Sequence, residues 1–352
     1  MKSKLKLNKN AKIIIILVLL LLILILATIL MIQSFNKKNN KESQTNKKKV
    51  TTKAEKVKIV DVNLNTRPIA VMINNNKAVW GYQAGLQDAY ITYEIIVEGG
   101  ITRMMALFKD KNTARIASVR SSRHYYLDYV LENDAIYAHI GWSPKAQSDI
   151  SSLKINNINA DNSSAFTWDN SLRKISREHR AYTTTEKIKA AAQKRGYRLT
   201  LDKKLLLNYQ VKSLDLTSYE GVISANIVRI PYSKSHLTSY RYDAENKVYK
   251  RYQNNIEHKD YVTGEQYKVK NIITYKVPNY SIDSYGRQNL DNIGSGDGYY
   301  ISEGYAIAIT WQKTSRSSQT IYKVKSTNKE LVVNDGNTFI QIQPESETLT
   351  IE

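Results

Sequence analysis

Two arginines stand where an apolar run gives way to an amphipathic one, in the stretch SVRSSRHYY. Residues 114–119 predict a short strand and the residues after Arg123 predict a helix, so Arg120 and Arg123 fall at a strand-to-helix turn. The start of a helix presents unpaired N–H groups and the positive end of its dipole, so further cations there are unfavourable. A negative charge is therefore expected at this turn, from a ligand or from the chain itself. Three carboxylates of the chain are candidates for such an ion pair: Glu94, Glu98 and Asp128.

A second strand-to-helix turn follows the first. Residues 135–141 predict a strand, and Ser143 followed by Pro144 is typical of a helix start. If the two strands lie in one sheet and are joined by the intervening helix, they are parallel, and their carboxyl ends open on the edge where α/β sheets bind ligands. Guanidinium groups, hydroxyls and helix-start N–H groups favour phosphate or carboxylate. The predicted ligand-binding residues are Arg120, Ser121, Arg123, His139, Ser143, His179 and Asn75.

Glu94 and Glu98 are four residues apart in a predicted strand, so their carboxylates are expected on the same face. Such a pair suits acid/base catalysis or a bound cation, whereas pairing with Arg103 across a hairpin is the structural alternative. The candidate catalytic residues are Glu94 or Glu98 as base and His139 as acid, in a hydrolase or transferase. His139 with a nearby serine also suggests hydrolysis, but the sequence lacks the Gly-flanked serine of an esterase elbow.

Composition excludes several kinds of chemistry. The chain has no cysteine, which excludes disulfides, cysteine nucleophiles and thiolate metal sites. It has no HExxH, HxxE, paired-His or DxD pattern, so neither a metal site nor a cofactor is predicted. Of the net charge of +20, most comes from residues 1–60, which hold 14 lysines and 2 acidic residues, so the remaining chain is only mildly basic. No nucleic-acid-binding module is recognisable, and nucleic acid is not expected as a partner.

Residues 13–32 are apolar except for Thr28. At about 1.5 Å per residue this run spans roughly 30 Å, the thickness of the hydrocarbon core of a bilayer. We therefore expect a cytoplasmic tail over residues 1–12, an uncleaved anchor in the lipid bilayer over 13–32, and a disordered basic linker over 33–61. The rest of the chain is expected outside the cytoplasm, as part of a single-pass protein of the cell membrane.

Beyond the linker the sequence changes character once. Residues 62–215 combine short apolar runs with helical patterns, including a hairpin about Gly99 and Gly100, and predict an α/β domain with a mixed sheet. Over residues 216–352 the helical period is replaced by aromatic and β-branched residues between turn signals, which predicts a β-rich domain. The expected fold class is α+β or α/β, preceded by the anchor helix.

The same segments resemble a known family. RPIAVMIN, ASVRSSRHYYLDYVLENDAIYAHIGWSPKA and REHRAYTTT are similar to the N-terminal part of the YerB-like lipoproteins of Gram-positive bacteria, and TGEQYKVKNIITYKV and NDGNTFIQIQP to the C-terminal part. The resemblance covers about residues 66–345 and implies a membrane-tethered, extracytoplasmic protein with a two-part domain of unknown function. Six positions match residues kept in the family pattern: Glu94, Glu98, Arg120, Arg123, His139 and His179.

The chain also departs from that family. It has no cysteine to carry a lipid, and the apolar run replaces the lipid. Where the family tends to read Pro-His-Asn, this chain has Glu178, His179 and Arg180. The family usually has an arginine before the segment PQSGL, and this arginine is missing from the matching segment GYQAGL, next to Trp80. Chemistry that depends on those positions is therefore not carried over.

Three functions remain open at this stage. The first is the capture of an anionic group, a phosphate or carboxylate of a wall polymer, lipid head or partner. The second is a hydrolase or transferase that acts on an envelope glycan or phosphate substrate. The third is a scaffold for other envelope proteins. The sequence leaves open whether the protein is an enzyme.

Overall fold

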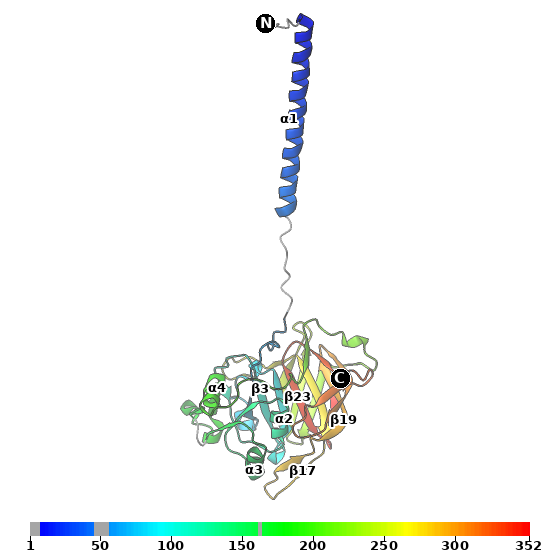
Figure 1. Cartoon of the computed structure of the whole chain (residues 1–352). Coiled ribbons are helices and arrows are strands. Elements are labelled where there is room, and N and C mark those ends of the chain that lie inside the picture. The colour runs from blue at the N-terminus through cyan, green and yellow to red at the C-terminus, as the bar shows by residue number, and fades with distance from the viewer. Residues whose placement is uncertain (1–7, 46–55, 161–163) are drawn as a thin grey trace. The chain divides into compact units, whose positions relative to one another are not determined.

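The computed structural model describes residues 8–45, 56–160 and 164–352, and the chain divides after residue 55 into two compact units. The first contains α1 (Lys9–Thr45), whose segment Ile13–Lys37 is long and apolar enough to cross a membrane (Figure 1). The predicted anchor, residues 13–32, lies inside this segment. The prediction of a disordered linker is wrong over residues 33–45, which continue the helix because no glycine or proline interrupts them. Residues 46–55 of that linker lie outside the described residues.

The second unit is built on a mixed sheet, in which the described residues form eleven strands. Along this main sheet the order is β10 (Ile223–Ser224), β20 (Tyr305–Lys313), β19 (Gly294–Ser302), β16 (Asn271–Val277), β23 (Thr338–Pro344), β2 (Ile91–Ile96), β3 (Thr102–Phe108), β1 (Ile69–Asn74), β5 (Ile136–His139) and β6 (Asn157–Asn159), with β21 (Ile321–Val324) paired to β20. β3 is antiparallel to β1 and β2, whereas β5 is parallel to β1. The central strands are buried along their whole length, which explains why they read as continuous apolar runs.

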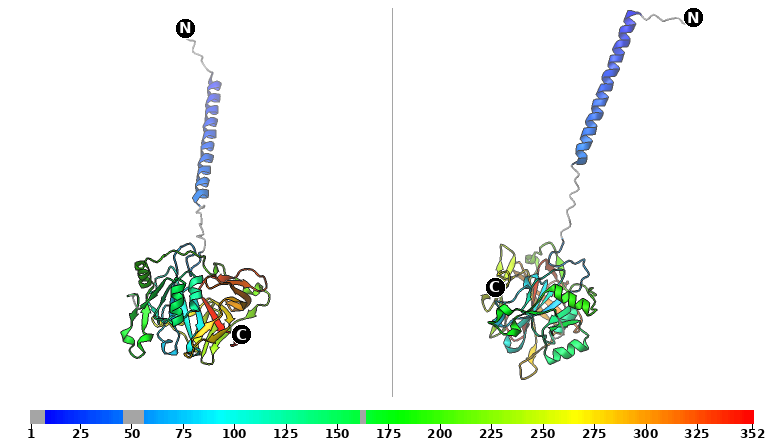
Figure 2. Two further views of the ribbon diagram at one scale, coloured as in Figure 1. Left: turned by 60° about the horizontal axis from the view of Figure 1, so that its bottom comes forward. Right: turned by 90° about the vertical axis from the view of Figure 1, so that its left-hand side faces the viewer.

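The two parts predicted as separate domains, 62–215 and 216–352, share this sheet. β23 pairs parallel with β2 on one side and with β16 on the other, and Figure 2 shows it in red between cyan and yellow strands. The end of the predicted linker also belongs to the second unit, because the backbone N–H groups of Lys58 and Ile59 donate to Asp335 at 2.8 and 3.0 Å. The predicted boundary near residue 215 therefore marks a change in composition and does not divide the fold.

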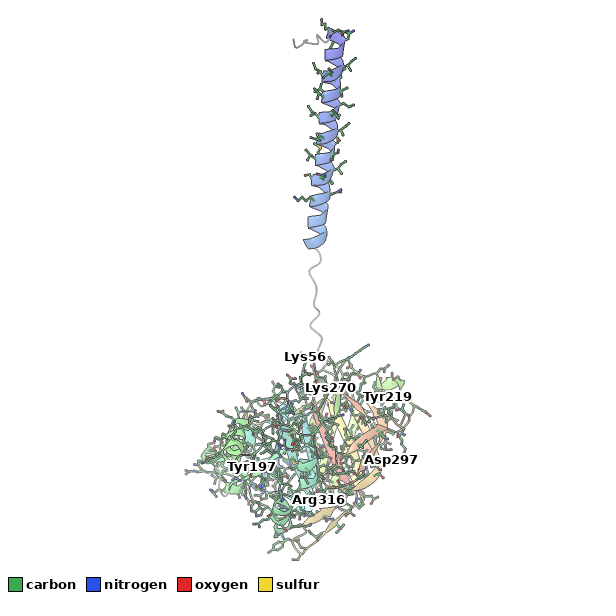
Figure 3. All side chains as sticks on the ribbon, viewed as in Figure 1. Lys56, Tyr197, Tyr219, Lys270, Asp297 and Arg316 are labelled. Carbon is green, nitrogen blue, oxygen red and sulfur yellow. The ribbon has the colours of Figure 1, made fainter. Side chains whose placement is uncertain are left out.

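Helices cover one face of the main sheet. α2 (Tyr126–Glu132) packs there, with the ring of Tyr129 stacked 4.8 Å from that of Tyr93, and we call this side the helix face (Figure 1). Arg316, labelled in Figure 3, joins α2 to α3 (Pro144–Ser152) by bonds of 2.6 Å to Asp128 and 2.8 Å to Asp149. α4 (Thr185–Lys194) is capped by Thr184, whose side chain accepts from the N–H of Lys187.

A second sheet covers the opposite side of the main sheet, which we call the sheet face. The ring of Phe339 in β23 lies 6.4 Å from Tyr240, and the hydroxyl of Tyr232 donates to the carbonyl of Glu94 at 3.0 Å. In the described part of the chain this second sheet consists of β14 (Ile256–Glu257), β13 (Val248–Gln253), β12 (His236–Asp243), β11 (Ile227–Ser233) and β24 (Thr350–Ile351), with β15 (Lys268–Val269) paired to β13. The core therefore fills both sides of the main sheet.

Shorter strands complete the fold. They are β17 (Asn279–Ser281) with β18 (Gln288–Leu290), β9 (Asn208–Gln210) with β22 (Val332–Asn334), and β4 (Ile116–Ala117) with β8 (Ala181–Thr183) and β7 (Thr167–Trp168). The expectation that residues 114–119 and 135–141 form parallel strands of one sheet is wrong, because β4 pairs with β8 and β5 with β1. The predicted fold class is confirmed: an apolar N-terminal helix, a mixed sheet with helices, and a β-rich C-terminal region.

Candidate anion-binding site

The two predicted turns lie side by side at the end of β1, although β4 is not part of the main sheet. The backbone N–H of Arg120 donates to the carbonyl of Met72 at 2.9 Å, and the N–H of Ile140 donates to the carbonyl of Arg120 at 3.0 Å. The N–H of Ser122 donates to Gly141 at 3.0 Å. Residues 120–122 therefore run between the ends of β1 and β5, and backbone bonds on both sides fix the turn that carries the arginines.

Three guanidinium groups gather at this turn, and we call Arg103, Arg120 and Arg123 the arginine cluster. Arg103 lies on β3 and donates to the carbonyl of Ser121, and Arg123 donates through Nε to Glu98. Glu98 Oε2 also lies 3.8 Å from Arg103 Nη2. One carboxylate in the hairpin turn after β2 is thus shared by two arginines, which is one of the ion pairs that the sequence left open.

The third arginine has a different partner. Arg120 Nη1 lies 3.1 Å from Glu178 Oε2, and the Glu178 side chain is 55% exposed, whereas that of Glu98 is 19% exposed. Burial alone would raise the pKa of Glu98, but the hydrogen bond and charge of Arg123 hold that pKa below its ordinary value. Burial and the charge of Arg123 lower the pKa of Arg103 to about 10, so Arg103 is still protonated at neutral pH. Three cations against two carboxylates leave one positive charge in excess.

His179 lies beside Glu178 at the edge of this cluster. Its Nδ1 is 2.9 Å from Asn74 Nδ2, and its Nε2 is 3.7 Å from Glu178 Oε1. The hydroxyl of Ser118 donates to the carbonyl of His179 at 2.7 Å and fixes the backbone there. Burial and the charge of Arg120 lower the pKa of His179, so its ring is neutral at neutral pH.

The remaining predicted residues of the two turns have structural partners. His139 Nδ1 is 2.8 Å from the carbonyl of Gly141, and its Nε2 is 3.2 Å from Asn157 Oδ1. Ser143 caps α3, with its hydroxyl accepting from the N–H of Ala146 at 3.3 Å, as the sequence predicts. Ser121 packs against Gly141, whose φ of +73° suits glycine, and a Cβ there would lie 3.3 Å from Ser121 Oγ.

Glu94 and Glu98 do not share a face, contrary to the sequence prediction. β2 ends at Ile96, so the two-residue period no longer holds at Glu98, which lies in the turn Glu98–Gly100. Thr92 pairs with Phe339, whose ring packs on Tyr240 of the second sheet, so Glu94, two residues after Thr92, also lies on the sheet face. Met104 and Ile73, its partners across β3 and β1, lie on the same face. His139 follows Ala138, the partner of Val71, and so lies on the helix face. The pairing of Glu94 as base with His139 as acid is therefore not formed.

Glu94 instead lies in a buried ion pair with Arg251 of the second sheet. Both side chains are 0% exposed, and Arg251 Nη2 donates to Glu94 Oε2 at 2.7 Å. Thr102 and Thr238 donate to Glu94 Oε1 at 2.8 and 2.9 Å. Burial would raise the pKa of Glu94, but the charge of Arg251 and the hydrogen bond from His236 hold it well below its ordinary value.

Asn75 belongs to this buried network and not to the arginine cluster. Its Nδ2 donates to Glu94 Oε1 at 3.1 Å, and its Oδ1 accepts from Gln83 at 3.0 Å and from Gln253. Its neighbour Asn74 is the asparagine that reaches the cluster. Arg251 was not predicted as part of a site, although a charged residue at a buried position of the alternating strand β13 is a signal for a buried partner.

Among the described residues, no group of three or more histidine, aspartate or glutamate side chains is placed to hold a metal ion. The chemistry that the site offers is therefore that of guanidinium groups and one neutral imidazole facing an exposed carboxylate. Such donors bind anions.

Comparison with known proteins gives one consistent result. The two parts of a family described as "Protein of unknown function (DUF3048)" match this chain, the N-terminal domain over residues 37–198 and the C-terminal domain over residues 228–340. A protein of Bacillus subtilis (strain 168), described as "Putative lipoprotein YerB", is 29% identical over 289 residues, which cover 81% of this chain and 83% of that protein. The crystal structure of the YerB protein from Bacillus subtilis is 28% identical, with a TM-score of 0.71, and the match covers 85% of this chain and 99% of that one. The resemblance predicted from the sequence is confirmed.

Proposed function

The chain belongs to the DUF3048 family, whose description states no function, and we propose from its geometry that it captures an anionic group of an envelope ligand or partner at the arginine cluster. The observation that carries this proposal is the charge at the turn between β1 and β5. Arg103, Arg120 and Arg123 face Glu98 and Glu178, so one positive charge is not neutralised. Guanidinium groups fixed in this way can donate to two oxygens of a carboxylate or phosphate at once.

The accessible part of the cluster is Arg120. Glu98 lies between Arg103 and Arg123, and separating these partly buried charges would be costly. The pair between Arg120 and Glu178 is exposed on the carboxylate side, and exposed pairs contribute only about 0.2–1 kcal/mol. A ligand is therefore expected to contact Arg120 first.

We further propose that α1 is a single-pass anchor and that residues 56–352 lie outside the cytoplasm. The segment Ile13–Lys37 has the length and composition of a membrane span. The relative from Bacillus subtilis is described as a lipoprotein, which supports a membrane tether for this chain too. Because the natural chain has no cysteine, Ser218→Cys, at an exposed position, and Ser3→Cys give a test without background. A membrane-impermeant maleimide is expected to label the first variant in whole cells and not the second, and the reverse result refutes this orientation.

Calorimetry tests the binding proposal. The detergent-solubilised full-length chain is titrated with inorganic phosphate and with phosphate-bearing wall-polymer fragments. Loss of a charge-assisted hydrogen bond costs about 1.5–3 kcal/mol, so the variant Arg120→Ala, Arg123→Ala is expected to bind at least about tenfold more weakly. Arg229→Ala removes an arginine from an exposed pair with Glu352 and is the matched control, expected to bind as the natural chain does. Equal binding by the double variant and the natural chain removes the basis of the proposal.

A further inference from the structure

The position of Glu178 indicates where the anionic group of a ligand would bind at the arginine cluster. Its two carboxylate oxygens face different donors: Oε2 lies 3.1 Å from Arg120 Nη1, and Oε1 lies 3.7 Å from His179 Nε2. Glu178 lies in the short turn Arg177–His179, and its side chain is 55% exposed. The protein thus holds one of its own anions between two side chains that are themselves more buried.

The hydrogen bonds of Asn74 determine which nitrogen of His179 carries the proton. The backbone N–H of Asn76 donates to Asn74 Oδ1 at 3.1 Å, so the amide of Asn74 turns its Nδ2 toward His179. Asn74 Nδ2 donates to His179 Nδ1, which must then be the acceptor. In the neutral ring the proton is on Nε2, which lies 3.7 Å from Glu178 Oε1 and so is near this carboxylate without a direct hydrogen bond to it. Arg120 and His179 therefore both place an N–H group near the same carboxylate.

Charge indicates which kind of anion fits best in that position. With Glu178 withdrawn, the three arginines of the cluster face Glu98 alone among the described carboxylates that pair with them, which leaves two positive charges. A carboxylate or a phosphodiester neutralises one of these charges. A phosphate monoester carries about −1.5 to −2 at neutral pH and neutralises both.

We propose that Glu178 occupies the place of the ligand's anionic group, and that a phosphate monoester displaces it to bind Arg120 and the Nε2–H of His179. This inference rests on the proposed function and adds the ligand class and the competitor. Displacement costs little, because the Glu178 side chain returns to water and the pair that it leaves is exposed on its side. The backbone bonds at Arg120 and at His179 keep the donors in place when Glu178 leaves.

The test compares Glu178→Gln with the natural full-length chain in detergent. The probes are glycerol 3-phosphate as a monoester, dimethyl phosphate as a monoanionic diester, and acetate. Since an exposed pair contributes up to about 1 kcal/mol, Glu178→Gln is expected to bind glycerol 3-phosphate about three- to fivefold more tightly, with a smaller gain for dimethyl phosphate and acetate. Glu257→Gln, which removes an exposed carboxylate paired with Lys259, is the matched control and is expected to change nothing.

The outcomes separate this inference from the proposed function. If Arg120→Ala, Arg123→Ala loses binding but Glu178→Gln binds no more tightly than the natural chain, the inference fails and the anion site stands. If neither set of changes alters binding, both fail. If glycerol 3-phosphate binds no more tightly than dimethyl phosphate and acetate at the same ionic strength, the choice of a monoester is also overturned. Short-chain phosphatidic acid in place of glycerol 3-phosphate shows whether the monoester is lipid-borne or soluble, because only a lipid-borne ligand gains affinity from acyl chains.

Discussion

Removing the buried arginine of the Glu94–Arg251 pair should destabilise the fold far more than removing an exposed one. Arg251→Met keeps most of the side-chain volume but leaves Glu94, which is 0% exposed, without its cation. Breaking a buried ion pair in this way costs about 3–5 kcal/mol. Thr102, Thr238 and Asn75 still donate to Glu94 Oε1, so the cost arises mainly at Oε2, which accepts from Arg251 at 2.7 Å.

Thermal unfolding of the full-length chain in detergent, followed by tryptophan fluorescence, measures this cost. At about 2–4 °C per kcal/mol for a large domain, Arg251→Met is expected to lower Tm by roughly 6–20 °C. The double variant Glu94→Gln, Arg251→Met removes both charges and should recover much of the loss, because replacing both partners is often close to neutral. Arg229→Met, at an exposed pair, should shift Tm by no more than a few degrees. A double variant as unstable as Arg251→Met would show that the cost is one of packing and refute the electrostatic reasoning.

Three further changes test other parts of the fold. Gly141→Ala places an alanine at φ +73° and a Cβ 3.3 Å from Ser121 Oγ, so it should lower the free energy of unfolding by about 1–3 kcal/mol, measured by thermal unfolding. Ser143→Ala removes the cap of α3 and should cost about 1 kcal/mol in the same assay, while Ser143→Asp, which can also cap, should not. Burial and the charge of Arg251 lower the pKa of His258, so the folded state resists its protonation, and stability should fall as pH drops below about 6.5, the ordinary value of the unfolded chain. His258→Gln should reduce that pH dependence between pH 7 and 5, with a remainder from His179, whose pKa is also lowered, and an unchanged slope would contradict the assignment.

Local signals in the sequence were sufficient to predict several elements of the site. Ser143 and Pro144 start α3 as predicted, and the hairpin about Gly99 and Gly100 forms between β2 and β3. These features depend on interactions within a few residues, such as a side chain that accepts from a nearby N–H, and glycines at positive φ. The sequence also predicted that the two strand-to-helix turns lie next to each other, although the strands that lead to them do not pair as expected.

What the sequence could not supply is the pairing between distant segments. The side of the sheet on which Glu98 lies depends on where β2 ends. If a strand is one residue longer or shorter, the side chains beyond it point to the other face. The partner of Arg120 is Glu178, 58 residues further along the chain by their numbers, and no local pattern joins them. Likewise Glu94 and Arg251 are 157 residues apart, and only the packing of the second sheet on the main sheet brings them together.

The alternation of side chains along β2 and β3 places Glu94 on the sheet face and Arg103 on the helix face. On the sheet face, Glu94 binds Arg251 of the C-terminal part, and the strand β23 pairs with β2, so the two parts matched by the family complete each other's core. On the helix face, Arg103 lies opposite Ile95, the residue after Glu94, and donates to the carbonyl of Ser121 in the turn that carries Arg120. The buried pair therefore joins the strands to the second sheet on one face, while the arginine cluster on the other keeps one positive charge in excess, which is the arrangement that the proposed anion site requires.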